Sequence, residues 1–332
     1  MGKMTVVTGA AGFIGRNVVA ELNRRGKTDL LLVDQLGTDE KWKNLLGLQY
    51  EDLLSPAEFL DRAHGIGNAA LPEIDGIVHM GACSATTELD ADYLLSNNYA
   101  YTRALAEWSQ AHGARFVYAS SAATYGDGTR TYDDADAVTP SLRPLNMYGY
   151  SKHMFDLWAL RQGLFNKVEN PIVGLKYFNV YGPWEEHKGD MRSVVHKSFG
   201  QVGTDGTGKV QLFKSHRPGY ADGEQMRDFL YVKDAVDVTL FMLGQPAIGG
   251  LFNCGTGIAR TWRDLVTAVY SAMGHNSQIE YIDMPAHLRG KYQYFTEATT
   301  DKLRAAGYTK PFTTLEDGVR EYVQHYLVKG TA

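Results

Sequence analysis

Residues 4–34, MTVVTGAAGFIGRNVVAELNRRGKTDLLLVD, decide the fold class of this chain. A short β-branched run is followed by three glycines, by a helical pattern and by a second apolar run that ends in a carboxylate. The glycines are Gly9, Gly12 and Gly15, and the carboxylate is Asp34. Glycines between a strand and a helix permit a tight turn and a close approach of backbone to a pyrophosphate at the positive end of the helix dipole. Glycines alone would fit an ordinary strand–helix turn, but with the flanking strand, helix and acid they predict dinucleotide binding.

Beyond this stretch, short apolar runs alternate with helical patterns as far as residue 180. Strands that are buried on both faces read as continuous apolar runs, so the alternation predicts a parallel sheet with helices on both faces. The predicted strands are 4–8, 30–34, 77–80, 116–119 and 172–177, and the clearest predicted helices are 13–25, 90–112 and 150–165. The predicted fold class is therefore α/β, with a Rossmann-type doubly wound parallel sheet.

After residue 180 the pattern loosens, and a long polar loop follows at 214–225. Later helices are predicted at 233–243, 261–273 and 314–327. We expect residues 1–180 to form the dinucleotide-binding Rossmann domain and residues 181–332 to form mainly a smaller, mixed α/β substrate lobe. Parts of 227–257 are expected to return to the first domain.

Composition limits the classes of partner. The chain of 332 residues carries 33 basic and 38 acidic side chains, a net charge of −5, which argues against a general nucleic-acid binder. No run approaches the ~20 apolar residues of a membrane helix, and the first residues enter a strand at once, so we expect no membrane partner and no signal peptide. Cys83 and Cys254 are too few for a disulfide framework and lack metal-ligand spacing. We therefore expect free thiols, no metal site and a reducing, cytoplasmic location.

The identity of the dinucleotide depends on the end of the second strand. A carboxylate there, Asp34, commonly accepts the adenosine ribose hydroxyls and favours NAD. Lys41, seven residues later, could instead neutralise a 2′-phosphate and favour NADP, or it could be a solvated charge on a helix face. We expect NADP, with NAD as the alternative.

Tyr148 and Lys152 lie four residues apart in YGYSK, at the start of a predicted helix, so both side chains project from one face. A free tyrosine has a pKa of about 10 and is a poor base at neutral pH. A lysine ammonium one turn away, together with the positive nicotinamide ring, would stabilise the phenolate and lower that pKa. Ser121, just past the predicted strand 116–119, can hydrogen-bond the substrate oxygen that gains or loses the proton. A serine at a strand end is often only a cap, but the three residues in this order predict an acid–base site.

These motifs resemble those of the extended short-chain dehydrogenase/reductase family, and within it the sugar-nucleotide epimerases that act on ADP-linked heptose. The resemblance extends over nearly the whole chain, and its GACS and HKG elements are much more specific than the glycines. The segments that carry it are HMGACSATTE (79–88), ASSAATYG (119–126), NMYGYSK (146–152), KYFNVYGPWEEHKG (176–189), RDFLYVKD (227–234), FNCGTG (252–257) and RGKYQYFT (289–296).

The resemblance implies an isomerase that inverts C6 of the heptose in an ADP-heptose by transient oxidation and re-reduction with a tightly bound NADP. It also implies a homo-oligomer and a role in supplying heptose for the lipopolysaccharide core. For the cofactor it implies contacts from Gly9, Gly12, Phe13, Ile14, Gly15, Asp34, Gln35, Lys41, Met80, Gly81, Ala82, Cys83, Ser84, Asn97, Lys152, Val180 and Lys188. For the ADP-sugar it implies contacts from Ser121, Asn179, Asp190, Lys197, Phe213, Arg227 and Tyr292.

Inversion by hydride transfer needs proton donors at two places. The nicotinamide stays on one side of the carbinol carbon, so the hydride that leaves one face must return to the other. Rotation about the C5–C6 bond of the carbonyl intermediate can present the second face, but it also moves the oxygen. The resemblance assigns the second proton donor to Lys188, in EEHKG, with Tyr148 at the first oxygen position. Otherwise Lys188 would be an ordinary loop charge.

Several residues on the substrate side depart from the family pattern. Asp190 follows HKG where a small hydroxyl residue is more usual, and a carboxylate there disfavours a nearby diphosphate unless it points away. His196–Lys197 falls where a substrate-contacting histidine is expected. Segment 214–226 is longer than in close relatives, and a second lysine that often supports NADP is missing near Ser55–Pro56.

Two other functions are open at this point. Another sugar-nucleotide enzyme, such as a UDP-hexose 4-epimerase, would turn the whole sugar over and would not need Lys188. A 4,6-dehydratase would need an acidic pair where this chain has Ala122 and Ala123. The other possibility is a dinucleotide-binding regulatory or structural protein with an inactive site, against which the intact serine, tyrosine and lysine argue.

Overall fold

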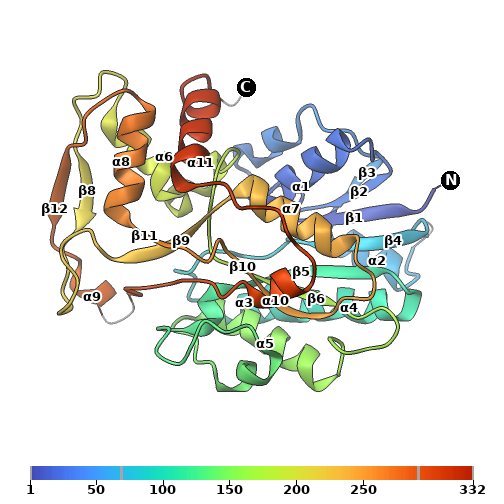
Figure 1. Ribbon diagram of the computed structural model, residues 1–332. Helices are drawn as coiled ribbons and strands as arrows, with labels where there is room; N and C mark the ends of the chain where they lie inside the picture. The colour runs from blue at the N-terminus through green and yellow to red at the C-terminus, as the bar shows by residue number, and fades with distance from the viewer. Residues whose placement is uncertain (1, 68–69, 290–291, 331–332) are drawn as a thin grey trace.

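The computed structural model describes residues 2–67, 70–289 and 292–330, and its centre is a seven-stranded parallel sheet (Figure 1). The strand order is β10-β6-β5-β4-β1-β2-β3, which confirms the predicted doubly wound sheet. The order reverses between β1 and β4, so the crevice that binds ligands in such sheets lies at the carboxyl ends of these two strands. The strands are β1 (Met4–Thr8), β2 (Leu30–Val33), β3 (Asp52–Leu54), β4 (Ile74–His79), β5 (Arg115–Ser121), β6 (Val173–Tyr177) and β10 (Gly250–Cys254).

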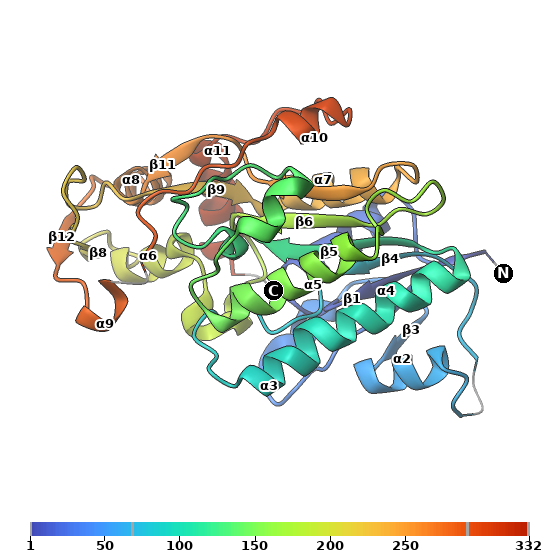
Figure 2. The same ribbon diagram turned by 90° about the horizontal axis from the view of Figure 1, so that it is seen from below.

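Helices cover both faces of this sheet (Figures 1 and 2). Helices α1 and α7 pack on one face, and α2, α4 and α5 lie on the other. Strands β2 and β6 bury every residue, as expected for strands that are covered on both sides. The bounds are α1 (Phe13–Arg24), α2 (Pro56–Ala63), α4 (Tyr101–His112), α5 (Met147–Arg161) and α7 (Val232–Leu243).

The remaining strands build a second lobe, to the left of the main sheet in Figure 1. Strand β9 pairs in parallel with β7 and antiparallel with β11, while β8 pairs in parallel with β12. Helices α6, α8 and α11 share one hydrophobic core cluster with α1 and α7, so the two lobes pack against each other directly. The bounds are β7 (Asn179–Tyr181), β8 (Val210–Phe213), β9 (Met226–Tyr231), β11 (Ala259–Thr261), β12 (Ile279–Ile282), α6 (Val194–Val202), α8 (Trp262–Ala272) and α11 (Leu315–Tyr322).

The predicted elements of the first 180 residues are present, with differences in detail. Strand β5 runs to Ser121, so this serine is the last residue of the strand and does not lie past it. The predicted helix 90–112 is divided into α3 (Ala91–Leu94), the π-helical turn η2 (Leu95–Ala100) and α4. Strand β3 and helix α2 escaped prediction because β3 has three residues and α2 fully buries only Phe59, too little for an apolar pattern.

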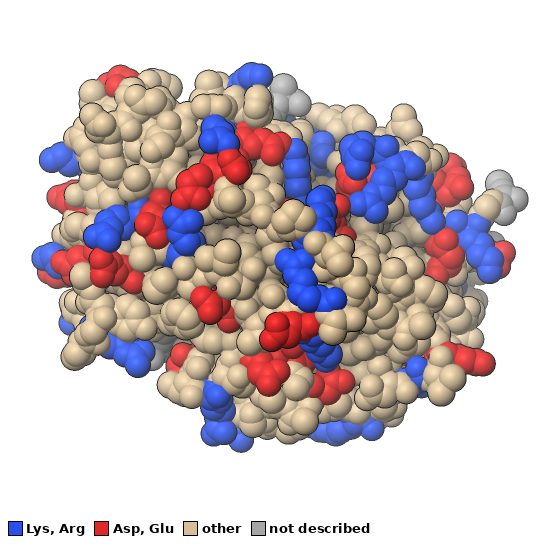
Figure 3. Space-filling view, viewed as in Figure 1, with Lys and Arg blue, Asp and Glu red and all other residues tan. Residues whose placement is uncertain are grey.

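The connections contain further short helical turns, two of which carry side chains of the site. These are η1 (Glu40–Leu45), η3 (Ala122–Tyr125), η4 (Asp136–Ser141), η5 (Glu186–Met191), α9 (Ala286–Arg289), α10 (Asp301–Ala305) and η6 (Val323–Leu327). Acidic and basic side chains lie next to one another over the face shown in Figure 3. Across the described ranges, no helix combines the length and the apolar character that crossing a membrane requires.

Candidate active site

A cavity of about 810 Å³ opens where the main sheet meets the second lobe. Its wall includes the turn after β1, the loop after β4, the end of β5, the start of α5 and the turn η5. Ligand pockets for small molecules commonly have about 300–1,000 Å³. Because the cavity lies at the crevice of a doubly wound sheet, its position and size both suit a dinucleotide with a second ligand.

The turn between β1 and α1 leaves no room for side chains. Gly9 has a φ of +65°, and a Cβ atom there would lie 2.6 Å from the backbone nitrogen of Gly81. A Cβ atom on Gly15 would lie 2.0 Å from the carbonyl oxygen of Gly9. Gly12 is the N-cap of α1, and among the described residues no side chain caps the first N–H groups of this helix. Bare N–H groups at the positive end of a helix form an anion site, and this cradle fits a pyrophosphate.

The carboxylate at the end of β2 is already engaged. Asp34 Oδ2 accepts the N–H of Ala11 at 2.7 Å, and Oδ1 accepts the N–H of Gln35 at 2.7 Å. Lys41, on η1, places its Nζ 2.6 Å from Asp34 Oδ1. Lys41 is therefore no freely solvated charge, and it neutralises the acid beside the glycine turn.

A buried histidine at the end of β4 connects the end of β1 to helix α4. His79 Nδ1 lies 2.6 Å from the hydroxyl of Thr8, and its Nε2 lies 2.8 Å from the hydroxyl of Thr102. The Thr102 hydroxyl also donates to the carbonyl of Asn98, so it accepts a hydrogen bond from Nε2–H, and the ring is the Nε2–H tautomer. Burial, reinforced by the positive charge of Lys152, lowers the pKa of His79 well below its ordinary value. His79 is therefore a neutral structural bridge.

The π-helical turn η2 turns two asparagines toward the site. Asn98 is fully buried, and its side-chain oxygen accepts the N–H of Cys83 at 2.9 Å. Its amide donates to the carbonyl of Cys83 and to the hydroxyl of Ser151. Asn97, which the resemblance assigns to the cofactor, lines the cavity. Single π turns inside α-helices frequently occur at functional sites, and here the turn joins the loop after β4 to helix α5.

The three residues of the predicted acid–base site come together at one wall. Tyr148 and Lys152 lie on the first two turns of α5, whose N-cap Asn146 accepts the N–H of Gly149. Burial raises the pKa of Tyr148, and a hydrogen bond with Ser121 opposes that shift. Burial lowers the pKa of Lys152 to about 8, with Asp156 and Cys83 opposing. The Lys152 ammonium also donates to the carbonyl of Ala119 at 2.8 Å.

A strained turn precedes η5, which forms a second wall of the cavity. Trp184 has a φ of +76°, a region that tryptophan rarely occupies, and the guanidinium of Arg16 stacks 3.8 Å from the centre of its ring. Glu185 is fully buried and accepts both the N–H and the hydroxyl of Ser193. The Tyr322 hydroxyl donates to Glu185 at 3.1 Å. These contacts tie the turn to α6 and α11, and backbone strain held this way commonly marks a functional site.

Lys188 projects from η5 into the same cavity. Its Nζ lies 5.1 Å from the centre of the Phe13 ring at the start of α1. Burial lowers the pKa of Lys188, Glu185 opposes that shift, and Lys197 adds to it. A buried lysine with a lowered pKa can release or take up a proton closer to neutral pH than a surface lysine.

Arg227 is the centre of a separate aromatic cluster. It is buried, and its guanidinium lies 5.1 Å from the ring centre of Tyr292 and 5.6 Å from that of Trp262. Phe213 packs edge-on against Tyr292. Among the described residues the guanidinium donates only to backbone carbonyls, so its charge has no carboxylate partner there. A buried, planar cation of this kind suits a phosphate.

The structure brings most predicted site residues together, but not all. Phe213, Arg227 and Tyr292 do not line the cavity, and their cluster adjoins it through Trp262. Asp190 and Lys197 are exposed and do not line it. Gly290 and Lys291 of the motif RGKYQYFT lie outside the described residues. The predicted residues that line the cavity are Gly9, Gly12, Phe13, Ile14, Gly15, Asp34, Gln35, Lys41, Met80, Gly81, Ala82, Cys83, Ser84, Asn97, Ser121, Tyr148, Lys152, Asn179, Val180 and Lys188.

Sequence reasoning missed several cavity residues. His187, next to Lys188, accepts a hydrogen bond at Nδ1 from the amide of Asn44 and faces the cavity. Tyr101 lines it with a hydroxyl that has no partner among the described residues. His187 stands within the EEHKG motif, and that motif is a signal that could have found it. Tyr101 carries no local signal, because only packing turns it inward.

The chain matches the model of the NAD dependent epimerase/dehydratase family over residues 5–255. A curated protein of Nitratidesulfovibrio vulgaris (strain DP4), named ADP-L-glycero-D-manno-heptose-6-epimerase, is 57% identical over 326 residues, 98% of each chain. The crystal structure of the Helicobacter pylori ADP-L-glycero-D-manno-heptose-6-epimerase is 27% identical, with a TM-score of 0.79 over 97% of this chain and 96% of that one. The UDP-glucose 4-epimerase of Thermus thermophilus, solved in complex with NAD, has the same fold at 24% identity and a TM-score of 0.73, over 99% of this chain and 100% of that one.

Proposed function

The chain belongs to the NAD dependent epimerase/dehydratase family, and on this premise we propose that it inverts C6 of the heptose in ADP-D-glycero-D-manno-heptose, giving the L-glycero form. The named relatives at high identity support this substrate, whereas the UDP-hexose epimerases share only the fold. The observation that carries the proposal is that one cavity holds proton-handling groups on two different walls. Tyr148 and Ser121 belong to the main sheet and its helix α5, and Lys188 belongs to η5.

A nicotinamide dinucleotide held along the glycine cradle supplies the hydride acceptor and donor for this inversion. The protein positions the sugar and handles the protons. Tyr148 takes the proton of the C6 hydroxyl, and the Ser121 hydroxyl hydrogen-bonds the same oxygen. The Lys152 ammonium, one turn along α5, favours the phenolate form of Tyr148.

Lys188 serves the second position of the oxygen. After rotation about C5–C6 the carbonyl oxygen faces η5, and the Lys188 ammonium gives it a proton while C6 is reduced from its other face. The lowered pKa of Lys188 suits a proton donor that works near neutral pH. In the reverse direction Lys188 takes the proton of the C6 hydroxyl, and Tyr148 gives a proton to the carbonyl oxygen. The oxidation and the reduction of C6 cancel, so one turnover makes no net redox change.

The substrate diphosphate is assigned to Arg227. Its guanidinium can bind two phosphate oxygens in a bidentate manner, and the rings of Tyr292 and Trp262 hold it in place. Phe213 extends the aromatic surface beside it, which suits the adenine of an ADP-sugar. This assignment places the nucleotide in the second lobe and the heptose between Tyr148 and Lys188.

We also propose the finer features of this enzyme. The cofactor is NADP, because Lys41 neutralises Asp34 and so removes the repulsion of a 2′-phosphate. Residues 1–180, with parts of 227–257, hold the cofactor, and residues 181–332 supply most substrate contacts. The enzyme acts in the cytoplasm as a homo-oligomer and supplies heptose for the lipopolysaccharide core.

The test is to incubate the purified protein with ADP-D-glycero-D-manno-heptose, without added cofactor, and to separate the two C6 epimers chromatographically. Conversion to an equilibrium mixture supports the proposal. UDP-galactose and UDP-glucose serve as matched substrates for the 4-epimerase alternative. Conversion of the UDP-hexoses in place of the ADP-heptose, by protein that contains its dinucleotide, would overturn the assignment of Lys188 and of the substrate.

A further inference from the structure

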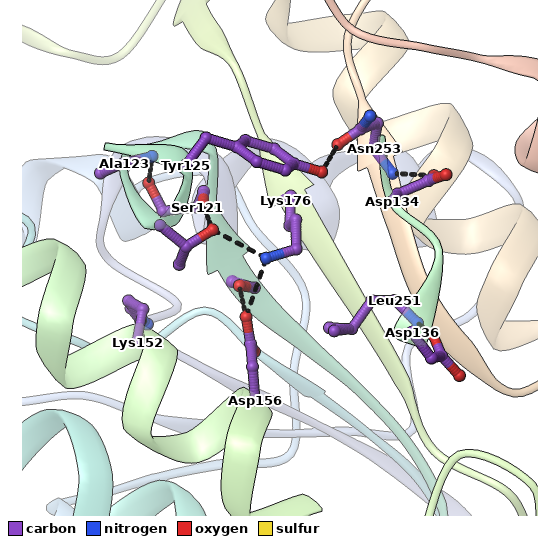
Figure 4. Close-up of polar contacts among 12 residues, drawn as sticks. Ser121, Ala123, Tyr125, Asp134, Asp136, Lys152, Asp156, Lys176, Leu251 and Asn253 are labelled. Carbon is purple, nitrogen blue, oxygen red and sulfur yellow. Dashed lines mark hydrogen bonds and ion pairs between the residues drawn. The ribbon is translucent and has the colours of Figure 1, made fainter. Parts of the chain in front are cut away.

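A buried ion pair lies beside two of the acid–base residues, Ser121 and Lys152 (Figure 4). Lys176, on β6, and Asp156, on α5, have side chains that are 1% and 0% exposed, and their charged atoms are 3.1 Å apart. Neither residue lines the cavity. No step of the proposed reaction uses them, although Asp156 lies one turn after Lys152 on the same helix.

The carboxylate of Asp156 ties helix α5 to strand β5. Its Oδ1 accepts the hydroxyl of Tyr118 at 2.7 Å, and its Oδ2 accepts the hydroxyl of Ser120 at 2.7 Å. Oδ2 also accepts the ammonium of Lys176. With three donors on two oxygens, the carboxylate is held in one orientation, and so is the turn of α5 that carries it.

The ammonium of Lys176 continues the connection to the end of β5. It donates to the hydroxyl of Thr124 at 2.7 Å, and that hydroxyl donates to the carbonyl of Ser121 at 2.8 Å. Lys152 donates to the carbonyl of Ala119. Each residue of 118–121 is therefore held by α5 or by a chain of hydrogen bonds that begins at Asp156.

Such a pair is a poor device for stability alone. Removing two charges from water is unfavourable, and apolar residues of similar volume often replace a buried ion pair without loss of stability. We propose that Asp156 and Lys176 form a positioning unit, which sets the place of Ser121 at the end of β5 relative to Lys152 on α5. This inference rests on the proposed roles of Ser121 and Lys152.

The charge of the pair also reaches Lys152. The charged and titratable groups around Lys152 are Tyr148 and Asp156 on α5, His79 on β4, Cys83 in the loop after β4, and Lys176 behind Asp156 on β6. Burial lowers the pKa of Lys152 to about 8, and Asp156 is the first of the groups that oppose this shift. Loss of the carboxylate would leave the ammonium of Lys176 uncompensated and lower the pKa of Lys152 further.

The first experiment follows kcat and KM for the ADP-heptose against pH in Asp156→Asn and in the double variant Asp156→Asn/Lys176→Met. In Asp156→Asn we expect the alkaline limb of kcat to move down by about one pH unit. We expect kcat at pH 8 to fall about fivefold or more, with KM and bound cofactor nearly unchanged. The double variant removes both charges, so no uncompensated ammonium is left beside Lys152. The alkaline limb of the kcat–pH profile should therefore return toward its wild-type position. A lower Tm with an unmoved limb would show a purely structural role and overturn the proposal.

Thr124→Val disturbs the buried ion pair less than Asp156→Asn does, and it tests the positioning role even if Asp156→Asn does not fold. It keeps every charge and nearly the same shape, but it breaks the connection from Lys176 to the Ser121 carbonyl. We expect a loss in kcat of several-fold with no shift of the pH limb, and wild-type kcat would contradict the positioning role. Asp136→Asn is the matched control, because it also breaks an ion pair, in which Asp136 Oδ1 lies 2.9 Å from the Nζ of Lys302. Asp136 lies on η4, away from Lys152 (Figure 4). It should leave kcat and its pH profile unchanged.

A readout without turnover separates this inference from the proposed function. When the lysines are labelled with carbon-13 at Cε, an NMR titration reports the pKa of Lys152. The Lys152 signal is identified as the one that is missing from the spectrum of Lys152→Met. The midpoint should move down in Asp156→Asn and return in the double variant. If the wild-type protein converts no sugar nucleotide, the proposed function fails while this titration still decides the coupling. An unchanged midpoint in Asp156→Asn would overturn the inference even in an active enzyme.

Discussion

The Nζ of Lys41 lies 2.6 Å from Oδ1 of Asp34, and both side chains line the cavity beside the first glycine turn. An acid at the end of the second strand of a Rossmann fold ordinarily discriminates against a 2′-phosphate. Here its charge is balanced from within the chain, and its oxygens already accept two backbone N–H groups. The same ion pair therefore bears directly on cofactor choice.

Lys41→Met should weaken NADP binding about tenfold to a hundredfold and leave NAD binding nearly unchanged, because only NADP loses a charged hydrogen bond. The measurement is calorimetric titration of cofactor-free protein with each dinucleotide. Lys43→Met is the matched control, since Lys43 also lies on η1 but pairs with Glu40 at the surface. Equal loss of NAD and NADP affinity in Lys41→Met would show that Lys41 only shapes the turn.

Lys188→Met should slow epimerisation strongly without preventing the oxidation of one C6 epimer. If Lys188 and Tyr148 serve different oxygen positions, one C6 epimer alone should still reduce the bound cofactor in Lys188→Met. In Tyr148→Phe only the opposite epimer should still reduce it. Overall turnover should fall by about 10² to 10⁴ in each variant. Absorbance of the reduced nicotinamide after each pure epimer is added measures this. Wild-type turnover in Lys188→Met would rule out a two-base mechanism.

The buried ammonium of Lys152 destabilises the folded protein below about pH 8. Burial lowers its pKa to about 8 in the folded state, against about 10.4 for an unfolded lysine. Below pH 8 Lys152 is protonated in both the folded and the unfolded state, and the full free-energy cost of burying its charge is present. Between about pH 8 and about pH 10.4 the unfolded state binds more protons, so the free energy of unfolding rises with pH and this cost disappears.

Lys152→Met should therefore abolish activity. It should also raise the free energy of unfolding at pH 7 by about 1–3 kcal/mol. The lower figure allows for the lost hydrogen bond to the Ala119 carbonyl. The gain should shrink as pH approaches 10. Urea unfolding at several pH values measures it, with Lys43→Met as an exposed control expected to stay within about 0.5 kcal/mol of wild type. A variant destabilised equally at every pH would contradict this view of Lys152.

Gly15→Ala should destabilise the cradle and release the dinucleotide. The new methyl group would stand 2.0 Å from the carbonyl oxygen of Gly9, and relieving such an overlap typically costs about 1–3 kcal/mol. Gly200→Ala is the control, because Gly200 lies within α6 with open space around it and should gain about 0.5–1 kcal/mol. Thermal unfolding and the dinucleotide content of purified protein are the readouts. A Gly15→Ala protein with wild-type Tm and full dinucleotide content would show that the turn can relax.

Local patterns in the sequence predicted the main sheet well. The runs 4–8 and 172–177 became β1 and β6, because strands buried on both faces are mostly apolar. The buried Lys176 in β6 is an exception to this pattern. Short elements such as β3 escaped prediction, since three residues show no period. The interruption of helix 90–112 also escaped it, because the π turn seats Asn98 between Cys83 and Ser151, which are distant in sequence.

The residues of the candidate site also divide into those that local spacing predicts and those that only tertiary packing positions. Gly9, Gly15, Tyr148 and Lys152 follow from spacing within one turn or helix, where short-range geometry determines the neighbours. The position of Arg227 next to Trp262 and Tyr292, and not in the main cavity, depends on how the second lobe packs. No local pattern encodes that arrangement.

By itself the sequence determined the alternation of strands and helices, the glycine turn and the pair of Tyr148 and Lys152, because each depends on residues a few positions apart. Only the tertiary structure decided that Lys41 neutralises Asp34, that Lys188 enters the cavity, and that Asp156 and Lys176 lie beside Ser121 and Lys152. The physical reason is burial. The pKa of a side chain and its hydrogen-bond partners depend on which distant segments exclude water from it, and that is settled only when the whole chain packs.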